Sequence, residues 1–456
     1  MDEPLTSRSP WDSSREVWTG RVDDEAAIAA AANAAATAFP QWSRAHDERR
    51  ERLQRLAQVI AGSQEEIVAL LVREAGKTIA DSRAEAELLG RKITISLEQG
   101  LARTPTTLPT SDAPGVVWRP RGVAVVLGPF NFPLHLLHGL VVPALAVGAT
   151  VVAKPSERCP AVGELYRRLL AAAGLADVAR IVQGGAAQAL ALIRQPAVAT
   201  VAAVGGRAMG VALAGQLSAR PEVVLALELG GVNQALVLDD ADLSAAAVAV
   251  ADGAWRLAGQ RCTATRIVHV PLAQRTAFMA LLQRERQQWL PDGTPTGANG
   301  ALITAAARSG FQAIHRAGAP GLRWVAGEVE RTFGASQCVE PLLLSVEDEV
   351  ARSQPLYREE HFGPALIVDG YDDLDDCVMR LAGNPHRLAA SVFTASRPRF
   401  LALAARLPYG QVNHNRPTAG ARSDLPFGGL GHSGNGRPAA LAAGQIFADE
   451  TVIWPA

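Results

Sequence analysis

The chain has 456 residues, of which 48% are hydrophobic and 20% charged, with 44 Lys and Arg against 45 Asp and Glu. This length exceeds what a single hydrophobic core usually supports, so we expect at least two domains. The near-neutral charge balance gives no global field that would favour nucleic acid or an anionic membrane, and neither is an expected partner.

The first residues and the cysteine pattern favour a reduced, cytoplasmic protein. Residues 1–4 are not followed by a basic region and an apolar core, so we expect no secretory signal. Apolar runs such as 139–153 are interrupted by Pro and Gly and are too short to span a bilayer. The cysteines at positions 159, 262, 338 and 377 are far apart, which argues against a disulfide framework and a zinc site.

Most of the first hundred residues are predicted to be helical. Segment 23–39 is rich in Ala and opens with acidic residues that suit a helix N-terminus. Further helices are expected over about 47–63, over 65–74, and from Ile79 into the nineties, because Leu, Ile and Val are interleaved along these segments. No chemistry is indicated in this part of the chain.

Between Thr104 and Gly122 the pattern changes to Thr, Pro and short apolar pairs. We predict a strand at 116–118 within this segment. An exposed strand edge needs cover, so pairing with a neighbouring subunit is physically sensible. A surface hairpin without a partner is the alternative.

Strands are expected to alternate with helices from Gly122 onward, as in a parallel sheet. The predicted strands cover 122–128, 150–153 and 179–182, with helices before Gly148 and over 165–174. Lys154 then stands at the carboxyl end of a strand, which is where open α/β sheets bind ligands.

A glycine-containing segment at 203–210 is the weakest indication of a nucleotide site. The dinucleotide fingerprint G-x-G-x-x-G is absent, although Gly205, Gly206 and Gly210 remain. Backbone N–H groups at a helix N-terminus can nevertheless hold a pyrophosphate.

A carboxylate and a thiol stand in two motifs that favour covalent catalysis. The motif Leu227–Gly231 places Glu228 at the end of an apolar run, before two glycines. The motif Gly259–Thr263 places Cys262 in a small polar turn after a helical stretch over 243–258. A carboxylate can take a proton and a thiol can attack a carbonyl. A lone cysteine is more often inert in a core, but the glycine and charged neighbours favour an approachable thiol.

The remaining chain is predicted to form a second α/β unit. A strand is expected over 266–270, followed by a Pro- and Gly-rich loop over 291–300. Segment 413–438 combines turn-forming residues with several cations and is expected to border a substrate funnel. A strand-like tail covers 445–454.

Six motifs, in order along almost the whole chain, resemble those of the aldehyde dehydrogenase superfamily. The E-L-G-G and G-Q-x-C patterns around Glu228 and Cys262 are similar to its general-base and nucleophile motifs. The other four motifs are Gly128-Pro129-Phe130-Asn131-Phe132-Pro133, Lys154-Pro155-Ser156-Glu157, Glu360-His361-Phe362-Gly363-Pro364, and Pro426-Phe427-Gly428-Gly429 with Ser433-Gly434.

This resemblance implies oxidation of an aldehyde with NAD as cofactor and without a metal. Cys262 is the expected nucleophile and Glu228 the expected base that activates water. Asn131 and the backbone N–H of Cys262 are expected to stabilise the oxyanion.

The resemblance also implies the residues that bind the cofactor. Lys154 and Glu157 are expected at the adenosine ribose, where a carboxylate would repel a 2′-phosphate and favour NAD over NADP. The altered segment 203–206 lacks the hydroxyl of the family's G-S-x-x-x-G pattern, which predicts weaker coenzyme binding. The implied cofactor residues are Lys154, Glu157, Gly205, Gly206, Gly210, Glu360 and Phe362.

The implied fold is α/β, with two parallel-sheet domains and a small β oligomerisation arm. A Rossmann-like NAD-binding domain is expected over 1–105 and 123–228, and a catalytic domain over 229–436. The arm is expected over 106–122 and 437–456, and it implies a homodimer or a dimer of dimers.

Within the superfamily, the segments 128–133, 182–185, 259–263 and 427–438 most resemble N-succinylglutamate 5-semialdehyde dehydrogenases. Such a substrate carries several carboxylates, so its pocket needs cations that can grip them. The candidates are Arg266, Arg416, Arg422 and Arg437.

Three alternatives stay open. The altered segment 203–206 permits a different aldehyde, for example a hydrophobic or aromatic one. A CoA-acylating enzyme is disfavoured because Glu228 is retained. A non-catalytic scaffold is disfavoured because Cys262, Glu228 and Asn131 are all present.

Overall fold

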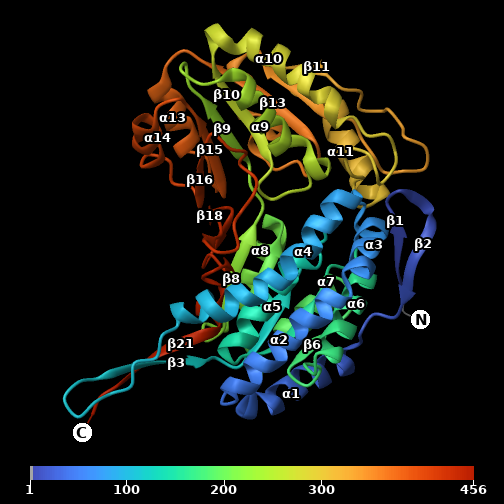
Figure 1. Ribbon diagram of the computed structural model, residues 1–456. Helices are drawn as coiled ribbons and strands as arrows, with labels where there is room; N and C mark the ends of the chain where they lie inside the picture. Colours follow the sequence, from blue (N-terminus) through green and yellow to red (C-terminus); the bar gives the residue numbers. More distant parts are fainter. Residues whose placement is uncertain (1–3, 456) are drawn as a thin grey trace.

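The computed structural model describes residues 4–455 and contains two large sheets (Figure 1). The first sheet has the order β19-β8-β7-β4-β5-β6; β4 to β8 run parallel, and β19 is antiparallel to β8. Every residue of β4 and β5 is buried, because β4 and the middle of β5 are apolar runs covered on both faces. Its strands are β4 (Val123–Leu127), β5 (Thr150–Lys154), β6 (Ala179–Ile181), β7 (Val198–Gly205), β8 (Val224–Leu229) and β19 (Gly434–Asn435).

Helices cover both faces of the first sheet and separate its core into two clusters. Helices α2 to α6 pack with alternate residues of β4, β5 and β7, and α1, α7 and α8 pack with the residues between them. This alternation follows from the opposite directions of successive side chains in a strand. The helices are α1 (Glu25–Trp42), α2 (His46–Gly62), α3 (Gln64–Ala75), α4 (Ile79–Ile95), α5 (His135–Val147), α6 (Pro160–Ala172), α7 (Ala186–Ile193) and α8 (Arg207–Leu217).

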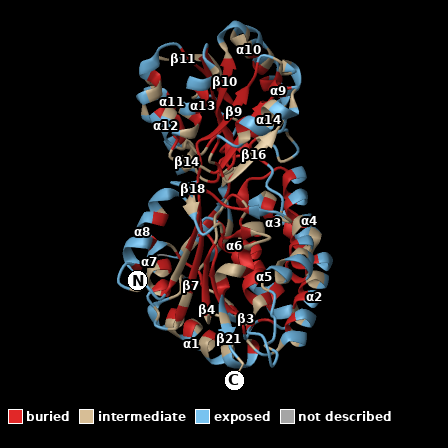
Figure 2. Ribbon diagram, turned by 90° about the vertical axis from the view of Figure 1, so that its left-hand side faces the viewer, coloured by how far each residue is buried: buried red, intermediate tan, exposed pale blue. Residues whose placement is uncertain are grey.

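The second sheet has seven strands in the order β11-β12-β13-β10-β9-β15-β16, and only the edge strand β11 is antiparallel to its neighbour. The strands of both sheets form a buried interior between helices whose outer faces are exposed (Figure 2). The strands are β9 (Asn233–Val237), β10 (Thr265–Pro271), β11 (Leu322–Ala326), β12 (Leu342–Val346), β13 (Ala365–Tyr371), β15 (Ala389–Phe393) and β16 (Gln411–His414).

Six helices cover the second sheet. α9 and α10 share one core cluster with it, and α11 to α14 contribute to two clusters on its other face. The helices are α9 (Leu243–Trp255), α10 (Leu272–Arg286), α11 (Ala305–Ala317), α12 (Pro355–Arg358), α13 (Leu374–Ala382) and α14 (Arg397–Ala404).

A two-stranded arm extends from the main body beside the C-terminus (Figure 1). It pairs β3 (Gly115–Pro120) antiparallel with β21 (Ala448–Ile453), so both predicted strands form and are partners within one chain. Short pairs complete the chain: β1 (Leu5–Ser9) with β2 (Asp12–Gly20), β14 (His386–Arg387) with β18 (Leu430–Gly431), and β17 (Pro426–Phe427) with β20 (Ala439–Ala440).

Where the structure departs from the sequence-based expectation, tertiary contacts are the reason. The N-terminal hairpin β1–β2 was not predicted. Helix α6 begins at Pro160, five residues before the predicted start at Leu165. The buried carboxylate of Glu74, which belongs to α3, accepts hydrogen bonds from the N–H groups of Ala161 and Val162 at 2.9 and 2.8 Å and so caps this helix from outside.

The chain passes from the first sheet to the second in residues 230–232, between β8 and β9. We propose a domain division at this crossing; the predicted boundary between residues 228 and 229 falls one residue before the end of β8. The strand β19, which lies near the end of the second proposed domain, returns to pair with β8 at Glu228.

Two negative findings concern the described residues only. Across residues 4–455, no helix combines the length and apolar character needed to cross a membrane. The same part of the chain contains no group of three His, Cys, Asp or Glu side chains placed to hold a metal ion.

Candidate active site

A cavity of about 650 Å³ opens at the carboxyl ends of the first sheet's strands. Its lining includes Gly128 after β4, Lys154 at the end of β5, Gly205 at the end of β7 and Glu228 near the end of β8. β4 is the first of these strands in the chain, and later strands are added on both of its sides, so the cavity lies at a topological switch point. Cys262 also lines the cavity. The sheet topology therefore brings the predicted base and nucleophile into one site.

A strained loop presents Cys262. Helix α9 ends at Trp255, and Leu257, Ala258 and Gly259 follow with φ values of 60°, 51° and 64°. The predicted helix over 243–258 is therefore three residues too long. Left-handed backbone costs a residue with a side chain about 1–2 kcal/mol, so other contacts must hold this segment.

Hydrogen bonds to the segment 299–303 hold the loop. The N–H of Ala258 donates to Oδ1 of Asn299 at 2.6 Å. The Gln260 amide donates to the carbonyl of Ala301 and accepts from the N–H of Ile303, both at 3.0 Å. These contacts fix the backbone two residues before the thiol.

Arg266 fastens this loop to the segment that follows α12. Its guanidinium donates to the carbonyls of Gly363 at 2.7 Å and Gly259 at 2.9 Å. A Cβ at Gly259 would lie 2.2 Å from the Gly363 oxygen. Only glycine therefore allows the two backbone segments to approach this closely, and its positive φ also favours glycine. We therefore do not retain Arg266 as a substrate ligand, because both of its terminal nitrogens donate to backbone carbonyls.

The other three candidate arginines are exposed or already engaged by acceptors of the protein itself. Arg416 is exposed. Arg422 is exposed and paired with Asp424, and Arg437 donates to the Gly410 carbonyl at 3.0 Å.

Glu228 is a fully buried carboxyl beside the half-buried Cys262. Burial raises the pKa of Glu228 to about 7, while the Cys262 thiol lowers it and nearby Glu360 raises it further. Neither carboxylate oxygen has a well-formed hydrogen bond to residues 4–455. A carboxyl with this pKa can exist in both protonation states near neutral pH, as a general base requires.

The Cys262 thiol is protonated in this environment. Burial raises its pKa well above the ordinary value, and the adjacent Glu228 carboxylate raises it further. A thiolate at Cys262 beside an ionised Glu228 would place two negative charges together, which is unfavourable. Formation of the thiolate is therefore coupled to protonation or displacement of Glu228.

Asn131 lies on the loop after β4 and reaches the nucleophile loop. Its Nδ2 donates to the Gln260 carbonyl at 3.0 Å, which orients the amide and leaves its second hydrogen for another acceptor. The backbone N–H of Cys262 forms no hydrogen bond within residues 4–455. Two donors near the thiol are thus available to a developing oxyanion.

A buried ion pair supports the Asn131 loop. Lys77 donates to Glu85 and lies 3.6 Å from the centre of the Phe132 ring. Glu85 also accepts from the N–H groups of Leu134 and His135 at 3.2 and 2.9 Å, at the start of α5. This support was not predicted, since no local pattern links Lys77 and Glu85 to Asn131.

Glu360 lies against the two glycines that follow Glu228. It accepts a hydrogen bond from the Gly231 N–H at 3.1 Å, and a Cβ at Gly230 would be 1.8 Å from its Oε2. Its pKa is raised by burial and lowered by Arg266. Phe362 packs edge-on against Phe130, with ring centres 5.6 Å apart. Both Glu360 and Phe362 line the cavity.

The other end of the cavity carries the predicted ribose residues. The Lys154 ammonium donates to the carbonyls of Gly184 and Pro155 at 2.7 and 3.0 Å and lies 3.7 Å from a Glu157 oxygen. Burial lowers the pKa of Lys154, and Glu157 opposes that shift. The Glu157 side chain is 46% exposed, so its oxygens are accessible.

The glycines at the start of α8 have different environments. Gly206 is the N-cap and has open space at its Cβ position, whereas a Cβ at Gly205 would meet the end of Met209 at 2.6 Å. Both glycines line the cavity. Gly210 lies outside the lining, and a Cβ there would be 2.8 Å from Leu229, so this glycine allows α8 to pack on β8.

An apolar slot completes the nucleotide end of the cavity. Side chains from α7 and α8 form it, and the sequence motifs did not indicate them. They are Ala186, Ala189, Leu190, Met209, Ala212 and Leu213.

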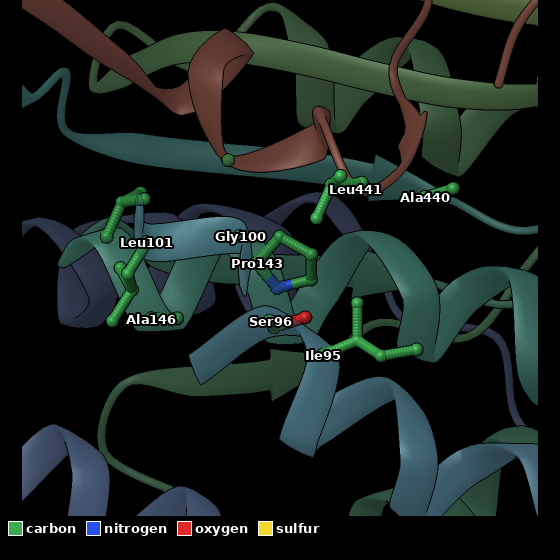
Figure 3. Close-up of a pocket in the computed structure, with 10 residues that line it drawn as sticks. Ile95, Ser96, Gly100, Leu101, Pro143, Ala146, Ala440 and Leu441 are labelled. Atoms are coloured by element: carbon green, nitrogen blue, oxygen red, sulfur yellow. The ribbon is translucent and has the colours of Figure 1, made fainter. Parts of the chain in front are cut away.

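A second crevice, at the base of the arm, is too small to be a ligand site. Figure 3 shows Ile95 and Ser96 beside Pro143, with Ala440 and Leu441 across from them. Its volume of about 10 Å³ is at the lower limit for a single water molecule.

An attacking thiol, a base of pKa about 7 and a cavity large enough for a nucleotide define a cysteine-dependent oxidoreductase of carbonyl compounds. Residues 2–451 match the model of the aldehyde dehydrogenase family. The chain belongs to that family.

Several relatives share most of its length. N-succinylglutamate 5-semialdehyde dehydrogenase 1 of Caulobacter vibrioides is 37% identical over 453 residues, covering 95% of this chain and 94% of the relative. The structure of γ-glutamyl-γ-aminobutyraldehyde dehydrogenase from Burkholderia cenocepacia is 28% identical and matches with a TM-score of 0.93, covering 99% and 94% of the two chains. A mutant aldehyde dehydrogenase C from Pseudomonas syringae, in complex with NAD+ and octanal, is 27% identical with the same TM-score and covers 100% and 95%. The predicted α/β aldehyde dehydrogenase fold is thereby confirmed.

Proposed function

We propose that this aldehyde dehydrogenase oxidises N-succinylglutamate 5-semialdehyde to N-succinylglutamate, with NAD as the hydride acceptor. The observation that carries the reaction type is the Cys262 thiol beside the fully buried Glu228 carboxyl in one cavity. The substrate assignment is supported by the 37% identity to a relative named for that aldehyde.

The residues perform the reaction in two stages. The Cys262 thiol loses its proton to solvent, the sulfur attacks the aldehyde carbon, and Asn131 Nδ2 and the Cys262 N–H donate to the resulting oxyanion. When NAD is bound, it supplies the acceptor for the hydride that leaves this carbon. Glu228 then takes a proton from water, whose oxygen attacks the thioester carbon, and the acid and the free thiol are released.

The cavity fits NAD in size and in chemistry. The apolar slot between α7 and α8 suits a flat base, and the first turn of α8 offers N–H groups to a pyrophosphate through Gly205 and Gly206. Lys154 and Glu157 would hold the adenosine ribose, and Glu360 and Phe362 would border the nicotinamide end. Glu157 disfavours the 2′-phosphate of NADP by charge repulsion.

Assembly and location belong to the same proposal. The arm leaves hydrophobic side chains exposed, with Val452 54% and Trp454 75% accessible, which supports pairing with another copy as a homodimer or dimer of dimers. Cys262 must stay a free thiol to react, and a reducing cytoplasm preserves it.

Restoring a hydroxyl at position 206 should tighten coenzyme binding. Gly206→Ser has room for its side chain, and one added hydrogen bond is worth ~1 kcal/mol, or about fivefold in Kd. Calorimetric titration with NAD measures this change. Gly205→Ser is the matched control, since its Cβ must displace Met209, and it should not tighten binding.

Equal turnover with NADP and NAD would contradict the role given to Glu157.

A panel of aldehydes, followed by NADH absorbance with and without CoA, tests the proposed function. We expect the highest kcat/KM with N-succinylglutamate 5-semialdehyde and no requirement for CoA. A higher value with a hydrophobic or aromatic aldehyde would reject the substrate, and dependence on CoA would reject hydrolysis by Glu228.

A further inference from the structure

A buried lysine without a partner lies between α4 and α5. Lys92 is 6% exposed, and burial is the only influence on its pKa, with no ion pair or hydrogen bond to its ammonium within residues 4–455. A buried charge is strongly unfavourable unless an opposite charge or hydrogen-bond acceptors compensate it. The catalytic mechanism makes no use of this cation.

Its position depends on a glycine in the facing helix. Gly139 of α5 lies directly against the lysine, and a Cβ there would be 3.0 Å from Nζ and 3.2 Å from Cε. The helix therefore keeps a gap in which the ammonium can lie.

A second polar group without a partner stands one helical turn before Gly139. The Nδ1 atom of His135 is buried and has no hydrogen-bond partner within the described residues. Lys92 lies close enough to lower the pKa of His135, after the larger effect of burial, so this imidazole is neutral. A neutral imidazole with its hydrogen on Nδ1 can donate to an anion.

The surrounding groups cannot neutralise Lys92. Glu85 is engaged by Lys77 and by the N–H groups of Leu134 and His135. The ring of His138 is engaged by the Tyr166 hydroxyl at 2.9 Å and the Leu89 carbonyl at 3.1 Å. Glu85 is thus paired with Lys77, and the Lys92 ammonium has no carboxylate partner within residues 4–455.

The cluster is also connected to the reaction centre. His135 follows Asn131 by four residues, and Gly139 follows it by eight. His135 is the first residue of α5, and Leu136, the next residue of that helix, lines the cavity together with Asn131 and Cys262. A substrate carboxylate bound there would be separated from the aldehyde carbon by several bonds.

We propose that Lys92, with His135, binds a carboxylate of the aldehyde substrate. This inference rests on the proposed function and replaces the arginines that the sequence suggested. The pKa of Lys92 is lowered to about 8 by burial, so the amine is still mostly protonated at pH 7. A bound carboxylate would raise the pKa of Lys92 toward its ordinary value, because the negative charge stabilises the protonated ammonium. The same stabilisation favours binding of the carboxylate.

The test compares two carboxylated aldehydes, N-succinylglutamate 5-semialdehyde and succinic semialdehyde, with neutral propanal. In Lys92→Met, we expect kcat/KM to fall about 10- to 100-fold for the carboxylated aldehydes, mainly through KM, because a charge-assisted contact is lost. The value for propanal should stay within about twofold. Arg91→Met, which removes the exposed cation one residue earlier on α4, should change none of the three.

A second variant keeps the proposal testable if Lys92→Met does not fold. Gly139→Ala retains the lysine but places a methyl group against its ammonium, so it should raise the KM of the carboxylated aldehydes and leave that of propanal unchanged. Thermal melting with the product N-succinylglutamate gives a readout without turnover. The product should stabilise the wild type more than Lys92→Met.

The outcomes separate the two claims. If the wild type makes no NADH from N-succinylglutamate 5-semialdehyde, the proposed substrate is wrong, and the succinic semialdehyde comparison still decides the role of Lys92. If Lys92→Met changes the carboxylated aldehydes and propanal by the same factor, or changes none of them, the lysine site is overturned.

Discussion

Replacing Cys262 by Ala should lower aldehyde oxidation more than about a thousandfold, because no other group can form the covalent adduct. Cys159, Cys338 and Cys377 are buried away from the cavity and cannot substitute for it. Steady-state NADH formation measures the loss.

The Cys262→Ala fold should remain intact. The side chain is half-buried beside a small apolar cluster with Leu388 and Phe427, so truncation to Ala removes little packing. Circular dichroism and the melting temperature serve as controls. Retention of more than a few per cent of the wild-type rate by a folded variant would refute the covalent mechanism.

Replacing Glu228 by Gln should slow turnover about 10²- to 10⁴-fold, the usual contribution of a general base. The slow step should be hydrolysis of the thioester, since attack and hydride transfer precede it. Stopped-flow absorbance should therefore show an initial NADH burst of about one equivalent per active site, followed by a much slower steady state. Disappearance of the burst would mean that Glu228 acts earlier, in activating the thiol.

The pH profile is the control for this variant. Because the pKa of Glu228 is about 7, its basic form increases as pH rises through 7, and wild-type hydrolysis should rise with it. The Glu228→Gln variant has no such group and should lose this rise. A profile that is identical in both proteins would assign the titration to another residue.

The sequence was most informative where local pattern and tertiary burial agree. The runs Val123–Leu127 and 151–153, which became β4 and the middle of β5, are apolar throughout, and both strands lie between helix layers. The motifs around Glu228 and Cys262 could be recognised from the sequence because they contain glycines, and close packing in the structure requires glycine at those positions. Gly230 faces Glu360, and Gly259 faces Gly363.

The sequence was least informative where a residue's role depends on distant partners. Arg266 was assigned to substrate, because nothing near it in the chain shows that it reaches the carbonyls of Gly259 and Gly363. Lys92 was not noticed, because its lack of a partner appears only when α5 is packed against α4. The left-handed turn after Trp255 continues a stretch of helical composition, and side chains outside that stretch, Asn299 and Arg266, hold it.

Mass spectrometry of the acyl-enzyme tests the central claim most directly. Glu228→Gln would be mixed with NAD and N-succinylglutamate 5-semialdehyde, quenched in acid during the burst, and analysed as intact protein and as peptides. We predict one adduct per chain with the mass of the aldehyde less two hydrogens, located on the peptide that contains Cys262. A burst of NADH without an adduct, or an adduct on Cys159, Cys338 or Cys377, would contradict the account.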